Sequence, residues 1–268
     1  MSDHPAFPSG HPLVRFGLNW PAPQRRITFK ATRWPEFLLP GATLVVLCLA
    51  VLDRPVAMAA AGISPVFRSI ALALTDLSTS KWLLSAVLVF ACCALVASAG
   101  PAARRLRLSA LLLGQQALYL FSSLAMASAI ANLVKRLIGR ARPMLFDSVG
   151  DFHFGGGLFS YAHQSFPSGH STAAGAFFGA MALLAPRYRP VFVSLALFFG
   201  FARVAVGAHY PSDVVAGLFF GAWLAFAMAV VFARYRVVFE PDCTGHPKFR
   251  TRNGCCVKSI KPMRYRGL

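Results

Sequence analysis

The sequence has few charged residues, and very few of them are acidic. Only 13% of its 268 residues are Asp, Glu, Lys or Arg, whereas a soluble domain usually has about 25%. The 9 acidic residues stand against 27 basic ones, and the formal net charge is +18. The composition is 56% hydrophobic, which excludes a disordered chain. A nucleic-acid-binding protein is disfavoured, because such proteins combine their basic charge with an ordinary water-soluble composition.

Charges are absent, or nearly so, from six stretches of the chain. A helix needs about 17 to 25 apolar residues to cross a hydrocarbon core of roughly 30 Å. The first stretch is slightly short for this, and the fifth contains one charge, Arg203. The expected spans are Phe37 to Leu52, Trp82 to Ala103, Leu108 to Val134, Ser165 to Pro186, Pro190 to Tyr210, and Val214 to Ala233.

The segment from Ile63 to Ser80 is too interrupted to span a membrane. It contains Arg68 and Asp76, and we expect it to form a short helix on the membrane surface. The fold class predicted from the sequence is therefore all-α. It is an integral membrane bundle of six transmembrane helices, with a short interfacial helix between the first and the second.

Most basic residues fall on one side of this six-span arrangement. That side receives the N-terminal arm, the loop at 104–107, the loop at 187–189 and the C-terminal tail. Cytoplasmic loops carry an excess of Lys and Arg, so we expect both termini in the cytoplasm. The arm lacks the apolar run of a secretory signal, and the first span should be an uncleaved anchor.

Three regions are expected along the chain. A basic cytoplasmic arm covers 1–35, a six-span membrane domain covers 36–235, and a basic cytoplasmic tail covers 236–268. The tail has mixed composition and no periodicity, so we expect it to be loosely ordered. Cysteines of the spans should behave as small apolar residues; they are Cys48, Cys92 and Cys93.

A second group of potential metal ligands lies in the tail. Its members are Cys243, His246, Cys255 and Cys256. Their spacing does not match a paired C-x-x-C zinc pattern, and a reducing cytoplasm disfavours disulfides. We therefore expect no metal and no cofactor, and the role of this group is left open.

Polar residues from several helix junctions converge on the outer membrane face. Arg203 lies about 20 Å along a helix that begins at Pro190, at 1.5 Å per residue. A charge inside an apolar span is costly and points to function. The full set is Lys135, Arg142, Ser168, His170, Arg203, His209 and Asp213.

This set has a chemical logic. Lys135 and Arg142 would project from one side if their helix continued to Pro143, which must end or bend it. Ser168 and Gly169 are at an expected helix N-terminus, where free N–H groups bind anions. Three cations and a helix N-terminus suit a phosphate. Two histidines and a carboxylate would then supply a nucleophile, a group to orient it, and an acid for the leaving oxygen.

Some of these residues have a simpler interpretation. We interpret Arg136 and Arg140 as anchors for lipid headgroups rather than as site residues. The basic residues in and next to the surface helix are explained in the same way; they are Arg54, Arg68 and Lys81. For Asp213, helix capping is as good an explanation as catalysis, because it lies three positions into a helix.

Three blocks of the sequence resemble the signature of the type 2 phosphatidic acid phosphatase family, which consists of integral membrane lipid phosphatases. The blocks are KRLIGRARP at 135–143, PSGH at 167–170 and RVAVGAHYPSD at 203–213. They correspond to K-x6-R-P, P-S-G-H and R-x5-H-x3-D. The last block often begins Ser-Arg in the family, whereas here Ala202 precedes Arg203, so one supporting hydroxyl is absent.

The resemblance implies a role for each matched residue. His209 would attack phosphorus to give a phosphohistidine, Asp213 would hold its imidazole, and His170 would protonate the leaving oxygen. A second group would bind the phosphate without a metal ion; it comprises Lys135, Arg142, Ser168, Gly169 and Arg203.

The function implied is hydrolysis of a lipid phosphate or diphosphate at the outer face of a bacterial inner membrane. This function is compatible with substrates of the undecaprenyl diphosphate, phosphatidylglycerophosphate or lipid A class. The loop from Met144 to Phe166 would overhang the site and could act as a gate for the lipid headgroup. Two alternatives remain, the first with the same catalytic residues and the second with the cationic pocket alone. One is a lipid-to-lipid phosphotransferase, and the other is a non-catalytic anion transporter or lipid-binding protein.

Overall fold

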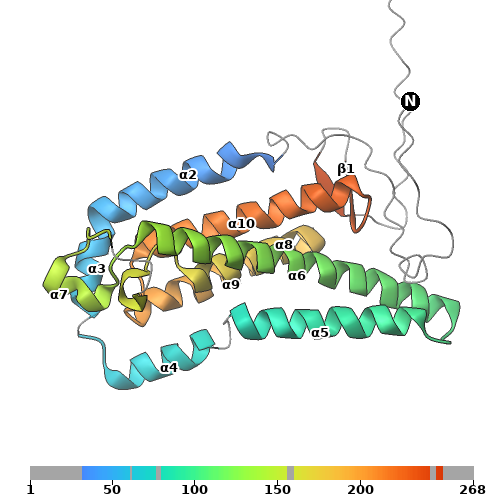
Figure 1. Ribbon diagram of the computed structural model, residues 1–268, viewed down its shortest axis with the longest axis horizontal. Helices are drawn as coiled ribbons and strands as arrows, with labels where there is room; N and C mark the ends of the chain where they lie inside the picture. Colours follow the sequence, from blue (N-terminus) through green and yellow to red (C-terminus); the bar gives the residue numbers. More distant parts are fainter. Residues whose placement is uncertain (1–31, 61, 77–79, 156–159, 242–245, 250–268) are drawn as a thin grey trace, which may run out of the picture.

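The computed structural model describes residues 32–60, 62–76, 80–155, 160–241 and 246–249. Nearly all of the regular structure is helical, and the long helices run along one axis (Figure 1). The long helices are α2 (Trp34–Leu47), α5 (Ser80–Ala99), α6 (Arg104–Ile138), α8 (Gly169–Leu184), α9 (Arg189–Ala205) and α10 (Pro211–Arg234). The shorter ones are η2 (Cys48–Leu52), α3 (Asp53–Ala60), α4 (Pro65–Asp76), η3 (Pro143–Leu145), α7 (Phe146–Val149), η4 (Tyr161–His163) and η5 (Pro186–Tyr188).

Five helices of the described residues are long and apolar enough to cross a membrane. They are Trp34–Ala59, Lys81–Ala99, Arg104–Ile138, Pro186–Ala205 and Pro211–Arg234. The remaining expected span corresponds to α8, which has 16 residues and would reach about 24 Å. This all-α membrane bundle confirms the predicted fold class, and the count of six spans stays a prediction.

The first helix runs further than the sequence indicated. We expected it to end at Leu52, before the charge of Asp53. Instead α2 passes through the π-helical turn η2 into α3 without a break, because the Asp53 carboxylate is fully buried and has partners inside the protein. The charge therefore lies within the helix and not beyond it.

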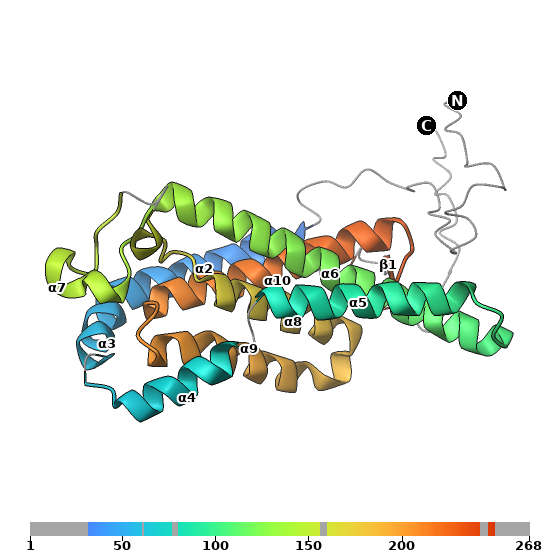
Figure 2. The same ribbon diagram turned by 60° about the horizontal axis from the view of Figure 1, so that its bottom comes forward.

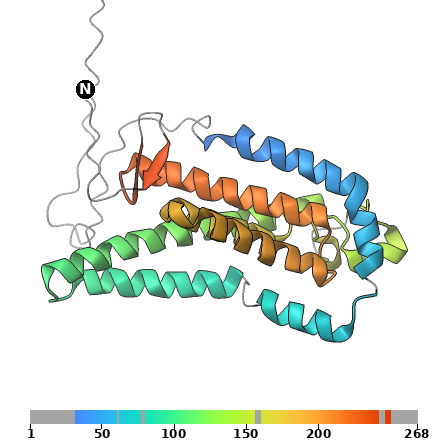
Figure 3. The same cartoon turned by 180° about the vertical axis from the view of Figure 1, so that it is seen from behind.

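α10 is the central helix of the bundle. It packs against α8, α2, α6 and α9, and the view from behind shows α8 and α9 alongside it (Figure 3). Close approach depends on glycine, because a small residue lets two helix backbones come near each other. A methyl group added to Gly221 would overlap the backbone carbonyl oxygen of Thr172 on α8, and one added to Gly175 would overlap that of Leu218 on α10.

This contact predicts a large loss of stability for Gly221→Ala. The added carbon would force α8 and α10 apart, and overpacking of this kind costs roughly 1–3 kcal/mol. Gly179→Ala is the matched control on α8, because its added carbon would lie 3.3 Å from Ala222 Cα. Thermal unfolding of both variants in detergent checks the prediction. Equal midpoints for the two would contradict it.

The surface helix predicted between the first two spans is present as α4. It packs against α9 and lies to the side of the bundle, below α9 when the molecule is turned (Figure 2). Val66 and Ile70 are exposed on it, which suits a helix at a membrane surface.

The prediction of a loosely ordered tail is wrong for the part that the structure describes. Strands β1 (Phe239–Pro241) and β2 (Pro247–Phe249) pair antiparallel, with Phe239 opposite Phe249. Phe239 is fully buried, and its ring centroid lies 4.8 Å from that of Tyr119 on α6. An aromatic contact that the composition did not reveal therefore orders this segment. Cys243, Cys255 and Cys256 lie outside the described residues.

Candidate active site

The polar residues selected from the sequence meet at one end of the bundle. The C-terminal ends of α6 and α9, the N-terminal ends of α8 and α10, and helix α3 all lie there, opposite the strand β1 (Figures 1 and 2). Antiparallel neighbours explain this arrangement, because each chain reversal at that end brings two helix termini together. The convergence predicted from span lengths is therefore observed.

His209 lies in the turn between α9 and α10 and is almost completely buried. Its Nδ1 is 3.6 Å from Asp213 Oδ2 and 3.4 Å from the Ser165 hydroxyl. Ser165 donates a hydrogen bond of 2.5 Å to the same carboxylate oxygen. The carboxylate and the hydroxyl thus face one edge of the imidazole ring and leave the other edge for the site.

Asp213 also caps α10. Its Oδ2 accepts a 3.0 Å hydrogen bond from the backbone N–H of Tyr210, which lies just before the helix. Capping and contact with His209 were alternative interpretations of this residue, and the geometry combines them. The capping hydrogen bond fixes the position of the carboxylate and therefore the direction of its contact with His209.

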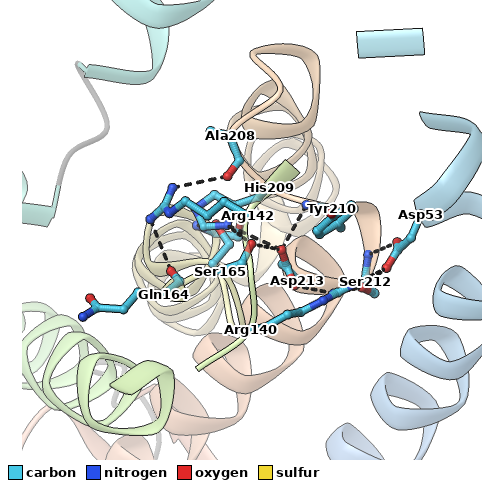
Figure 4. A network of polar contacts seen from close by, with 12 residues as sticks. Asp53, Arg140, Arg142, Gln164, Ser165, Ala208, His209, Tyr210, Ser212 and Asp213 are labelled. Carbon is cyan, nitrogen blue, oxygen red and sulfur yellow. Dashed lines mark hydrogen bonds and ion pairs between the residues drawn. The ribbon is translucent and has the colours of Figure 1, made fainter. Parts of the chain in front are cut away.

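Arg140 is where the sequence interpretation is wrong. It was expected to anchor lipid headgroups, but its side chain is fully buried. Nη1 donates 2.6 Å hydrogen bonds to Asp213 Oδ1 and to the Ser212 hydroxyl, and Nη2 donates one of 2.8 Å to Asp53 Oδ2 (Figure 4). The two buried carboxylates explain why Arg140 is buried, because a charged group without partners is not stable in the protein interior.

Three further cations lie close to His170, and two of them also lie close to His209. Little of their surface is exposed, namely 8% at Lys135, 5% at Arg142 and 6% at Arg203. Solvent therefore has little access to these charges. A methyl group on Gly169 would lie 3.3 Å from Lys135 Nζ, so the ammonium group sits at the N-terminus of α8. This combination of cations and helix N-terminus suits an anion.

Arg142 reaches the site by a different route from the one expected. The helix does not continue to Pro143. It ends at Ile138, and Gly139 follows with a φ of 64°. Arg142 is then held by three backbone carbonyls, those of Tyr161 at 3.0 Å and of Ala208 and Gln164 at 3.2 Å. The loop, and not a shared helix face, aligns it with the other cations.

α8 begins at Gly169 with Ser168 as its N-cap. The Ser168 hydroxyl accepts a hydrogen bond of 2.9 Å from the Ser171 hydroxyl, which orients the first turn. His170 follows, and its Nε2 is buried without a hydrogen-bond partner among the described residues. A ring nitrogen in that state is able to exchange a proton with a bound substrate.

The loop from Met144 to Phe166 is tied to the segment after α6 in its described part. Ala141 N–H donates to the His153 carbonyl at 2.9 Å, and Ser165 N–H donates to the Arg140 carbonyl at 3.0 Å. These hydrogen bonds position Ser165 beside His209. Residues 156–159, the centre of the predicted gate, lie outside the described residues.

Burial controls the charge of His209, which lies outside the membrane-spanning helices. Desolvation lowers its pKa to about 4, although Asp213 acts in the opposite direction. Arg142 and Lys135 lower the pKa further. The imidazole is therefore neutral at ordinary pH and retains a lone pair for attack.

Sequence reasoning missed three polar residues of this cluster, namely Asp53, Ser165 and Ser212. Asp53 had a visible signal, because it is a lone carboxylate at the end of an apolar run. The two serines had none, since hydroxyl groups near a helix start are common. Among the described residues, no three His, Cys, Asp or Glu side chains group closely enough to hold a metal ion.

Comparisons with known proteins support a common ancestry. The family model of the PAP2 superfamily matches residues 116–236. The "Lipid A 1-phosphatase" of Rhizobium johnstonii is 41% identical over 220 residues, which are 80% of this chain and 87% of that protein. The "Lipid A 1-phosphatase" of Rhizobium etli is 51% identical over 129 residues, 48% of this chain and 56% of that protein.

One solved structure is also similar. The PAP2 type phosphatidylglycerolphosphate phosphatase of Bacillus subtilis has a TM-score of 0.47 and 20% identity, and the match covers 75% of this chain and 94% of that one. The family assignment itself comes from the sequence matches, in which the three motif blocks lie within or next to the same 220 residues. The chain belongs to the PAP2 superfamily and is a multi-pass bacterial membrane lipid phosphatase.

Proposed function

We propose that this protein removes the 1-phosphate of a lipid A molecule at the outer face of the inner membrane, through a phosphohistidine. The observation that carries the mechanism is one buried cluster, in which His209 contacts Asp213 and three nearly buried cations lie beside the two histidines. The substrate is suggested by the 41% identical relative, whose name specifies that position on lipid A. The outer face is supported by the distribution of basic residues, most of which fall with the termini.

The first chemical step is an attack by nitrogen on phosphorus. Nδ1 of His209 faces Asp213 and Ser165, so Nε2 carries the attacking lone pair. As the N–P bond forms, the bond between phosphorus and the sugar oxygen breaks, and His170 donates its proton to that oxygen. Lys135, Arg142 and Arg203 stabilise the charge on the phosphoryl oxygens, which is the main requirement of phosphoryl transfer.

The second step restores the enzyme. A water molecule loses a proton to the now deprotonated His170 and attacks phosphorus, and the N–P bond breaks to give inorganic phosphate and neutral His209. Asp213 stabilises the positive imidazole ring that exists between the two steps, in the way a buried carboxylate supports a catalytic histidine. All the charges that the reaction needs come from side chains of this chain.

Phosphate release from lipid A tests the proposal. Purified protein in detergent is expected to release inorganic phosphate from the 1-position with excess chelator present. Phosphatidylglycerophosphate and undecaprenyl diphosphate should react at least about tenfold more slowly, an estimate equal to roughly 1.4 kcal/mol of discrimination. Right-side-out vesicles given external substrate should be active and inverted ones inactive.

Three outcomes would overturn parts of this proposal separately. Loss of activity on chelation would reject the metal-independent mechanism. Preference for one of the other two lipids would reject lipid A as the substrate. Transfer of the phosphoryl group to an acceptor lipid, with no inorganic phosphate formed, would replace the hydrolase by a phosphotransferase.

A further inference from the structure

Two buried aspartates share one arginine beside the histidine. Arg140 donates to Asp213 through Nη1 at 2.6 Å and to Asp53 through Nη2 at 2.8 Å. We propose that Asp53 and Arg140 are positioning residues that orient Asp213 and preserve its negative charge for the phosphorylated state of His209. This inference rests on the proposed function, because it assigns the two residues a part in the same reaction.

Asp53 reaches Arg140 because of the π-helical turn before it. Gly41 and Cys48 are buried on the first helix and lie seven residues apart, or about two α-helical turns, so they share a face. A regular α-helix would return to this face after about four more residues. The wider turn from Cys48 to Leu52 delays the return by one residue and brings Asp53 to the buried face.

Such turns are uncommon and are frequently found at functional sites. The face on which Asp53 lies is the one that packs on α10, since a methyl group on Gly41 would contact the Phe219 ring. The first helix therefore delivers a carboxylate to the active-site end of α10. A helix that served only to anchor the chain in the membrane would have no use for this charge.

The two carboxylate oxygens of Asp213 have different partners. Oδ1 is bound by Arg140, while Oδ2 faces Tyr210 N–H, Ser165 and His209. Rotation of the carboxylate would break bonds on both sides. Arg140 therefore fixes the direction in which the second oxygen faces the imidazole ring.

Ser212 closes the arrangement between the two aspartates. Its hydroxyl accepts a 2.6 Å hydrogen bond from Arg140 and donates one to Asp53 Oδ2. Its backbone N–H donates to Asp53 Oδ1 at 3.0 Å. Arg140 Nη2 also donates to the Asp151 carbonyl at 2.9 Å. Each of the four carboxylate oxygens consequently has a partner, and Asp213 is the aspartate of the pair that faces His209.

The shared charge has an electrostatic consequence. One guanidinium between two carboxylates leaves the trio with a net negative charge, which stabilises a positive imidazole ring. If Asp53 were neutral, Arg140 would cancel the charge of Asp213 alone. The cations that face the ring, Lys135 and Arg142, would then be unopposed while His209 carries the phosphoryl group.

The test is Asp53→Asn, which preserves the shape of the side chain and removes its charge. We expect kcat for phosphate release to fall about 10- to 100-fold, a range typical of a disturbed catalytic geometry. KM and the inhibition constant of inorganic phosphate should change by less than about twofold, because the anion pocket is untouched. Glu36→Gln is the matched control, since it removes an exposed, ion-paired carboxylate of the same helix.

A second variant covers failure of the first to fold. Arg140→Lys retains the charge but loses the fork that reaches both aspartates, and the same selective loss of kcat is expected. An unchanged kcat in either folded variant would overturn the inference. A parallel rise of KM and of the phosphate inhibition constant would also overturn it, because that result indicates that the two residues only link helices structurally.

The outcome is separable from the fate of the proposed function. If wild-type protein releases no phosphate, or His209→Ala retains activity, the function or its mechanism fails. If wild-type protein is active through His209 and Asp53→Asn behaves like Glu36→Gln, only the positioning role fails.

Discussion

His209→Ala is expected to abolish phosphate release, with a fall of about 10⁴-fold or more in kcat. Removal of a covalent nucleophile has effects of this order in other enzymes, because the remaining groups bind the phosphate without any atom to attack it. The side chain is almost completely buried beside Asp213, and the proposed mechanism uses the neighbouring His170 as the acid and not as the nucleophile. Phosphate release from lipid A in detergent is the measurement.

The control for this variant is His153→Ala. That side chain is exposed in the loop before Tyr161, and the hydrogen bond that holds the loop at this residue is accepted by its backbone carbonyl, which the substitution retains. We expect nearly wild-type activity from it. Residual activity of His209→Ala within tenfold of wild type would reject the phosphohistidine mechanism.

Lys135→Met is expected to lower kcat/KM by about 10²- to 10³-fold, the usual cost of one charged donor at a transition state. The ammonium group lies where a methyl on Gly169 would be 3.3 Å away, so it faces the same space as the α8 N-terminus. Methionine retains the length of the side chain and removes the charge. The binding of inorganic phosphate should weaken in parallel.

The neighbouring residue provides a matched control. Arg136 carries the same charge but is exposed near the end of the helix, where contact with lipid headgroups is expected. Arg136→Met should leave kcat/KM within about twofold, since an exposed charge is screened by solvent. Equal losses in the two variants would show that the effect comes from net charge at the membrane and not from the site.

Much of the fold follows from patterns that are local in the sequence. Apolar stretches bounded by charges predicted the six long helices of the described residues, because a helix in lipid has to satisfy its own backbone. The boundaries were less accurate where tertiary contacts intervene. Asp53 ended the first span in the sequence interpretation, whereas its ion pair with Arg140 lets the helix continue.

The site divides in the same way. Motif spacing and helix direction predicted that the histidines, the three cations and Asp213 lie at one end of the bundle. The same reasoning placed Arg140 at the lipid headgroups, because a charge next to a span end usually lies there. Its burial depends on Asp53, 87 residues earlier in the chain, and on Asp213, 73 residues later.

The sequence by itself determined the membrane class, the helical fold and the residues that we propose bind the phosphate, because hydropathy and motif spacing act over short stretches. Only the tertiary structure decided which carboxylates neutralise Arg140, how Ser165 comes to contact His209, and why the first helix has a π-helical turn. These contacts join segments far apart in the chain, and a buried charge is stable only where such partners are assembled.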